Sequence, residues 1–151
     1  MDSSAEDPFR LDRFLEAQEP VFEKVMRELK AGRKQSHWIW YIFPQLDGLV
    51  PFPSDNTRFY SIKGPAEAHA YLCHPILGSR LVECVNAVLA HRDHSALQIF
   101  GEVDEQKLFS SLTLFAAVAE PSSVFHQLLE SHFQGGKDAA TLRLLEPASN
   151  R

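Results

Sequence analysis

The stretch from Gly32 to Gln45 (GRKQSHWIWYIFPQ) holds the residues best suited to chemistry in this chain. It places Lys34 and His37 directly before a run of bulky aromatic side chains, and it ends at a proline followed by Gln45. A surface loop rarely carries so much apolar area, and a segment that serves only the core rarely carries a lysine and a histidine beside it. The pattern is typical of a segment that forms part of the core and also lines a site.

The polar end of this stretch favours the binding of an anion. Lys34 would supply positive charge, and Ser36 would donate a hydrogen bond together with the backbone N–H groups of the helix that follows. A structural role is also open. Ser36 would then only cap that helix, and Arg33 and Lys34 would lie near the negative end of the preceding helix dipole.

The two tryptophans, Trp38 and Trp40, are candidates for stacking against a ligand ring. Such stacking is worth about 1–3 kcal/mol per base in nucleic-acid complexes. Residues two apart on a helix point about 200° away from each other, so at most one of the two faces a site. For either one alone, burial in the core is the preferred interpretation.

Asp104, Lys107 and Ser111 form a second polar group. At i, i+3 and i+7 they share one helix face, and Ser110 flanks them. Lys107 could contact a phosphate or carboxylate, with Asp104 orienting the ammonium group. The alternative is an exposed Asp–Lys pair, worth about 0.3–0.5 kcal/mol, with the serines tolerated through hydrogen bonds to carbonyls of the preceding turn.

His74 and Arg80 form a third polar group. His74 precedes a proline and can cap the helix that follows, which is the preferred interpretation, or it can act as a general acid or base. Arg80 lies one to two turns further on. For catalysis we favour His37 as acid or base, with Lys34 and Lys107 stabilising developing negative charge.

The bulk composition bounds the class of protein. The 151 residues fit one domain. The formal net charge of −5 and the absence of a basic stripe argue against nucleic-acid binding. The sequence has no signal-peptide core and no apolar run long enough to span a membrane, so we expect a cytoplasmic protein. Its two cysteines, Cys73 and Cys84, are expected to be free, buried thiols.

Motifs for cofactors are absent from the sequence. There is no P-loop, no GxGxxG and no GxSxG pattern, and the seven histidines do not show the spacing of a metal site. We therefore expect neither a cofactor nor a metal. The sequence leaves open whether the protein is an enzyme, and it does not determine the oligomeric state.

Apolar periodicity and capping residues predict an all-α protein, a single compact domain of seven to nine mostly short helices. The domain is expected at residues 9–146, with a disordered lead at 1–8 and a tail at 147–151. A long loop is expected from Asp47 to Gly64, with a short extended segment at 57–62. The helices are expected near residues 11–18, 20–30, 37–43, 65–73, 75–91, 95–100, 104–120, 124–133 and 138–145.

Four segments of the chain resemble the domain of unknown function 1810 family. They are GRKQSHWIWYIFPQL, YLCHPILGSRL, IFGEVDEQKLFSSLTLF and GGKDAATLRLL, and the resemblance spans about Leu11 to Leu145. The family pattern has methionine where this chain has Ile39 and Leu112, which are apolar replacements. The resemblance implies a mainly helical fold and a set of marked positions, and it implies no activity.

Together these patterns favour a pocket where the three polar groups meet. It would bind an anionic small molecule, nucleotide-like or phosphorylated, and Gln45 would contribute to its lining. An alternative is a non-catalytic interaction module that uses the 47–64 loop and its aromatic residues Phe52, Phe59 and Tyr60. RNA binding through the basic start of the tryptophan stretch is a third hypothesis, which the net charge opposes.

Overall fold

The computed structural model describes residues 7–146, and within that range the chain forms ten helices and no strand. The predicted all-α single domain is confirmed. The ten helices slightly exceed the seven to nine that were expected, and seven of them have seven residues or more. The expected tail at 147–151, and the expected lead apart from residues 7 and 8, lie outside the described residues. The helices are α2 (Asp12–Gln18), α3 (Phe22–Ala31), α4 (Ile39–Ile42), α5 (Asp55–Phe59), α6 (Pro65–Cys73), α7 (Leu77–Leu89), α8 (Ala96–Phe100), α9 (Glu102–Val118), α10 (Val124–Phe133) and α11 (Ala139–Leu145).

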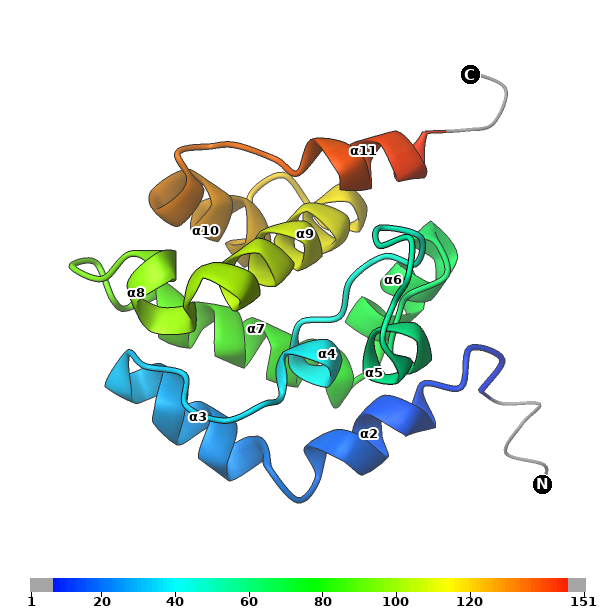
Figure 1. Cartoon of the computed structure of the whole chain (residues 1–151), viewed down its shortest axis with the longest axis horizontal. Coiled ribbons are helices and arrows are strands. Elements are labelled where there is room, and N and C mark those ends of the chain that lie inside the picture. The colour runs from blue at the N-terminus through cyan, green and yellow to red at the C-terminus, as the bar shows by residue number, and fades with distance from the viewer. Residues whose placement is uncertain (1–6, 147–151) are drawn as a thin grey trace.

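Two helices form the centre of the fold (Figure 1). Helix α9 packs against α6, α8, α10 and α11, and α7 packs against α3, α6 and α10. The short helix α4 contacts both α2 and α9. The tryptophan stretch, which contains α4, therefore bridges the N-terminal helices and the long central helix.

Capping residues set several helix boundaries as predicted. Ser95 begins α8 in a reciprocal capping box with Gln98, and the Ser123 hydroxyl accepts the His126 amide at the start of α10. Gly32 ends α3 with φ of 76°, a left-handed conformation that glycine adopts without steric cost.

Other boundaries differ from the predictions. Helix α3 begins at Phe22, so Pro20 lies in the turn before it rather than at its first position. Ser36 does not cap α4, which begins only at Ile39. The segment predicted to be extended at 57–62 contains part of α5, because the Ser54 hydroxyl caps this helix by accepting the Thr57 amide.

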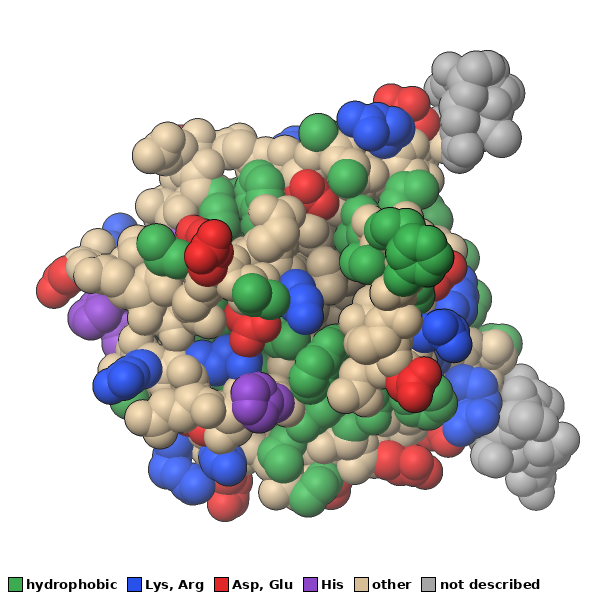
Figure 2. All heavy atoms as spheres, viewed as in Figure 1, with side chains coloured by type: hydrophobic (Ala, Val, Ile, Leu, Met, Phe, Trp, Pro, Cys, Tyr) green, Lys and Arg blue, Asp and Glu red, His purple; other side chains and the backbone are tan. Residues whose placement is uncertain are grey.

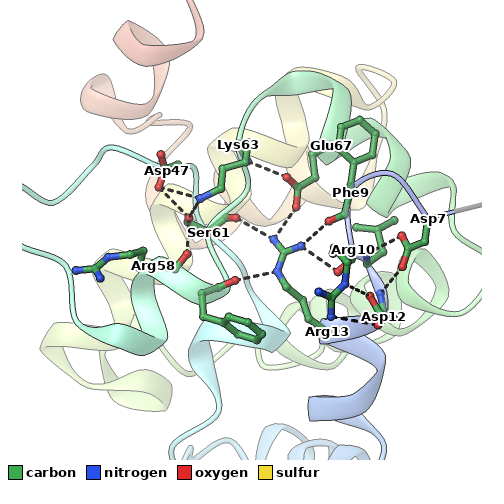
Figure 3. Close-up of polar contacts among 12 residues, drawn as sticks. Asp7, Phe9, Arg10, Asp12, Arg13, Asp47, Arg58, Ser61, Lys63 and Glu67 are labelled. Carbon is green, nitrogen blue, oxygen red and sulfur yellow. Dashed lines mark hydrogen bonds and ion pairs between the residues drawn. The ribbon is translucent and has the colours of Figure 1, made fainter. Parts of the chain in front are cut away.

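A buried arginine anchors the long loop (Figure 3). The Arg13 guanidinium donates to the Glu67 carboxylate at 2.7 Å and to the Ser61 carbonyl oxygen at 3.0 Å. It also donates to the carbonyl oxygens of Phe9, Arg10 and Phe59. Both charged side chains are shielded, with 9% and 2% of their surfaces exposed. One arginine thus ties α2 to the end of the loop and to the first turns of α6.

The loop is also closed at its base. Leu46 and Ile62 form an isolated parallel bridge, in which the Asp47 amide donates to the Ile62 carbonyl and the Ile62 amide donates to the Gln45 carbonyl. The predicted loop is therefore a compact segment that contains the helix α5 in place of the extended segment expected at 57–62.

Helices α6 and α7 meet at a sharp break. Their axes differ by 86°, and a Cβ atom on Gly78 would lie 2.0 Å from the carbonyl oxygen of Leu72, so no larger residue fits there without moving the backbone. The break separates the two free cysteines. Cys84 is buried as expected, but the prediction was wrong for Cys73, which is exposed at the end of α6. Among the described helices, none by itself is long and apolar enough to cross a membrane, and only α6 and α7 taken as a bent pair reach that length and composition.

A candidate ligand pocket between α4 and α9

A pocket of about 450 Å³ lies between the tryptophan stretch and the first turns of α9. Figure 2 shows basic, acidic and histidine side chains around a hollow on this face, between α4 and the start of α9. The pocket combines residues from the first and second polar groups of the sequence. Its lining residues are Lys34, His37, Ile39, Trp40, Phe100, Gly101, Glu102, Val103, Asp104 and Lys107.

On one side of this pocket, the buried side chain of Lys34 connects the tryptophan stretch to α9 through an ion pair. Its ammonium group lies 2.6 Å from the Asp104 carboxylate, with 5% of the side chain exposed, and it also donates to the Ser36 carbonyl oxygen. The Lys34 amide donates to the Ile99 carbonyl at 2.8 Å. From the sequence, Asp104 was predicted to orient Lys107, but in the structure it pairs with Lys34. The charge of Lys34 is therefore already balanced inside the protein.

Lys107 provides the unbalanced positive charge. Its ammonium group lies 5.5 Å from the centre of the Trp40 ring, within the range of a cation–π contact. No carboxylate within residues 7–146 forms an ion pair with it. Lys107 and Trp40 thus form a cationic and aromatic wall of the pocket.

The two tryptophans have different environments. Trp38 is 1% exposed and packs edge-on against Phe100, and its indole N–H donates to Glu28 at 3.0 Å. Trp40 is half-buried and lines the pocket. Of the two candidates for stacking, Trp38 is a core residue and Trp40 is the one that a ligand could contact.

Two buried polar atoms near this wall lack a partner. They are the indole nitrogen of Trp40 and the hydroxyl of Ser111, for which the described residues supply no hydrogen bond. Ser111 lies one turn after Lys107 on the same face of α9. A buried polar group without a partner costs about 1–3 kcal/mol, so each of these two atoms could bind a polar ligand atom or an ordered water.

The neighbouring serines Ser110 and Ser111 should respond differently to truncation. Ser110 donates to the Asp138 carboxylate at 2.8 Å, so Ser110→Ala should lower the free energy of unfolding by about 1.5–3 kcal/mol. Ser111→Ala removes an unpartnered hydroxyl and should change it by less than about 0.5 kcal/mol, or increase it. Urea unfolding of both variants checks this. Equal losses would show that the Ser111 hydroxyl has a strong partner.

Glu28 organises the turn that carries the pocket residues, a role that was not predicted from the sequence. Its carboxylate accepts hydrogen bonds from the amides of Gln35 and Ser36, from the Ser36 hydroxyl and from the Trp38 indole, at 2.6–3.0 Å. Burial by itself would raise the pKa of Glu28, but these hydrogen bonds outweigh it and lower the pKa to about 2. The sequence held a signal for this role, because Glu28 lies on the same helix face as the apolar residues Val25 and Leu29.

The other candidate residues lie outside the pocket. Ser36 faces Glu28, and Gln45 lines a smaller cavity of about 30 Å³ that Trp40 also borders. His74 accepts the Ile76 and Leu77 amides at the start of α7, which is the capping role preferred from the sequence. Arg80 pairs with Glu19 at 2.9 Å. The third polar group is therefore not part of this site.

No metal site is apparent in the described part of the chain, where no three histidine, cysteine, aspartate or glutamate side chains are arranged to hold an ion. The pocket offers instead one free ammonium group, one histidine and an aromatic ring. Fold and pocket together define a small all-helical protein with a polar and aromatic pocket on its long central helix.

Comparisons with known proteins place this chain in one family. The family model "Protein of unknown function (DUF1810)" matches residues 8–145, so the chain belongs to that family. A crystal structure of the conserved hypothetical protein Rv1873 from Mycobacterium tuberculosis is similar, with 46% sequence identity and a TM-score of 0.88. The match covers 92% of this chain and 98% of that protein. No curated protein matches the chain.

Proposed function

We propose that the protein binds a small molecule with an anionic group in the pocket between α4 and α9. The observation that carries the proposal is the ammonium group of Lys107, which lies against Trp40 without a carboxylate partner in residues 7–146. An unpaired cation beside an aromatic ring attracts an oxoanion joined to a planar group, because the cation binds the charge while the ring packs against the flat part.

The start of α9 adds to the attraction for an anion. Gly101 and the first helical residues line the pocket, and the amides of the first turn of a helix have no acceptor within the helix. Helix α9 has 17 residues, and its dipole places partial positive charge at this end. Two acidic residues also line the pocket, but Asp104 is already paired with Lys34.

The second acid, Glu102, narrows the class of ligand. It is exposed, and among the ion pairs of the described residues it has no cationic partner. A carboxylate at the edge of an anion site repels a uniformly charged ligand but accepts hydrogen bonds from hydroxyl or amino groups. Nucleotide-like molecules and phosphorylated sugars meet both conditions, because they carry an anionic group and several hydroxyl donors. We place this activity in the cytoplasm, where free thiols such as those of this protein are stable.

His37 is the residue of this pocket that could transfer a proton. The side chain is exposed and lines the pocket, and it forms no hydrogen bond with the described residues. An imidazole whose two nitrogens form no hydrogen bond with the protein can donate a proton to a bound ligand or accept one from it. Should the ligand be turned over, His37 would act as acid or base and Lys107 would stabilise negative charge on it.

Lys107→Ala should weaken ligand binding without destabilising the protein. Loss of one charge-assisted hydrogen bond corresponds to a loss of affinity of about tenfold to a hundredfold. Because both tryptophans lie at or next to the pocket, their fluorescence can be titrated with nucleotides, dinucleotides, ADP-ribose and sugar phosphates. Lys107→Arg should retain binding since it keeps the charge, and the exposed Lys137→Ala is a matched control.

Two outcomes would oppose this proposal. Unchanged affinity in Lys107→Ala would show that the ammonium group does not contact the ligand. A large fall in the melting temperature would show that Lys107 has a structural role. If none of the ligand classes changes the fluorescence of the wild-type protein, the proposal of an anion site at Trp40 fails.

A second function is favoured by the surface of the 47–64 loop. Phe52 is 92% exposed, Phe59 54% and Val50 44%, and Figure 2 shows hydrophobic side chains gathered over this loop. Large exposed apolar patches mark protein–protein interaction sites, so the exposed side chains of this loop favour a protein-interaction module. Phe52→Ser should then abolish capture of the partner while leaving the ligand titration unchanged, and loss of both would contradict separate sites.

A further inference from the structure

A third surface, on the other side of the α6–α7 break, combines a nucleophile with an apolar groove. The groove has a volume of about 590 Å³ and is formed by the end of α6, the start of α7, the end of α9 and the start of α10. This size is within the range of small-molecule sites. Its apolar lining residues include Leu72, Val82, Val118, Val124 and Phe125.

Cys73 and His69 lie together in the lining of this groove. They are one turn apart on α6, and the Cys73 sulfur is 3.6 Å from Nε2 and 3.8 Å from Nδ1 of His69. Both side chains are exposed, and neither forms another hydrogen bond with the described residues. The Nδ1 atom of the next histidine, His74, already accepts two amides of α7. Among the lining residues of the groove, Glu120 is the one Asp, Glu, Lys or Arg side chain.

We propose that Cys73 is a covalent modification site for α,β-unsaturated carbonyl compounds that carry an alkyl chain. His69 accepts the thiol proton, and the sulfur attacks the β-carbon of the compound. The C–S bond forms as the carbon–carbon double bond is lost, and the proton returns to the α-carbon. This addition has no leaving group and needs no oxidant or reductant, and the alkyl chain lies along the groove.

The two parts of the site explain this choice of ligand. A sulfur nucleophile is soft and reacts well with such electrophiles, and a neighbouring imidazole can accept the thiol proton as the C–S bond forms. The apolar lining favours an electrophile that carries a hydrocarbon chain, because burial of that chain removes it from water. The site is separate from the α4–α9 pocket, so it stands or falls independently of the proposed function.

The chain-length dependence of the reaction tests the groove. N-methyl and N-pentyl maleimide are allowed to react with the native protein, and labelling is followed by intact mass and peptide mapping. Each methylene that leaves water entirely is worth about fourfold. N-pentyl maleimide has four more methylenes than N-methyl maleimide, and in an open groove they are only partly removed from water. We therefore expect the ratio of the two rates (N-pentyl over N-methyl) to be about tenfold larger for Cys73 than for glutathione. Equal ratios for Cys73 and glutathione would overturn the proposal.

Cys84 serves as an internal control in this experiment. It is 1% exposed, and burial raises the pKa of its thiol well above the usual range. It should remain unlabelled while Cys73 reacts completely, and Cys73→Ser should abolish the labelling. Labelling of Cys84 at the rate of Cys73 would show that the reaction reports unfolding instead of the groove, and would overturn the proposal.

The pH dependence of the rate tests His69. His69→Gln should slow the reaction of Cys73 with N-methyl maleimide by about threefold or more at pH 6–7. The difference should disappear in alkaline solution, where hydroxide ionises the thiol without help. His94→Gln, an exposed histidine outside the groove, is the matched control and should match the wild type throughout. A rate for His69→Gln equal to that of the wild type at every pH would overturn the role of the imidazole and with it the site as proposed.

Discussion

Replacement of Arg13 by methionine is expected to lower the free energy of unfolding by about 3–5 kcal/mol. The guanidinium satisfies four carbonyl oxygens as well as the Glu67 carboxylate, and both charged side chains are shielded from water. Methionine fills much of the same volume but leaves the carboxylate buried without a counter-charge. A protein of this size is stable by about 5–15 kcal/mol, so the variant should lose a large part of its stability.

A double-mutant cycle with Glu67→Leu separates the ion pair from the other contacts of Arg13. The double variant should recover part of the loss, since no charge is left buried, but not all of it, because the carbonyl oxygens lose their donor. Arg10→Ala is the control, as its ion pair with Asp12 is exposed and contributes far less. If urea unfolding showed similar losses for the Arg13 and Arg10 variants, the buried cluster would not be what holds the long loop to α2.

Local signals in the sequence predicted much of the helical pattern. A glycine that needs a positive φ, a proline at the first helical position and a serine cap act within one turn of chain, so Gly32, Pro65 and Ser95 could be assigned without knowing the fold. The predictions failed where a distant partner competes with the local one. Ser36 has the residue type and position of a cap, but the Glu28 carboxylate takes its hydroxyl and its amide.

The candidate pocket was predicted in part, for the same reason. Periodicity showed that Asp104 and Lys107 share a helix face, and composition singled out Lys34, His37 and Trp40. Which face of α9 meets the tryptophan stretch depends on the packing of several helices, and this packing pairs Asp104 with Lys34. The same packing places His74 and Arg80 on another part of the surface. There His74 accepts an amide at the α6–α7 break, and Arg80 pairs with Glu19 in the α2–α3 turn.

The role of Glu28 makes the stability of the protein depend on pH. The pKa of this carboxyl group is about 2 in the folded protein and about 4.5 when unfolded, so folding favours the charged form. A group of this kind stabilises the protein fully above the unfolded pKa, and the stabilisation is lost as the pH falls from about 4.5 through about 2. At 1.36 kcal/mol per pKa unit the contribution at neutral pH is about 3 kcal/mol.

Glu28→Gln should therefore lower the free energy of unfolding by about 3 kcal/mol at pH 7 and by almost nothing at pH 2. Urea unfolding at a series of pH values measures this difference, and Glu23→Gln, an exposed change in the same helix, is the control that should show no such trend. If the loss of unfolding free energy were the same at every pH, its cause would be a poor fit of the glutamine amide and not the loss of the charge.

Because the Glu28 carboxylate holds the turn that presents Lys34 and His37, the Glu28→Gln variant should also bind the ligand more weakly at pH 7, even where it remains folded. Unchanged ligand binding in a folded Glu28→Gln protein would show that the turn held by Glu28 does not contribute to binding. Lys107 and Trp40 would then be the residues on which binding depends.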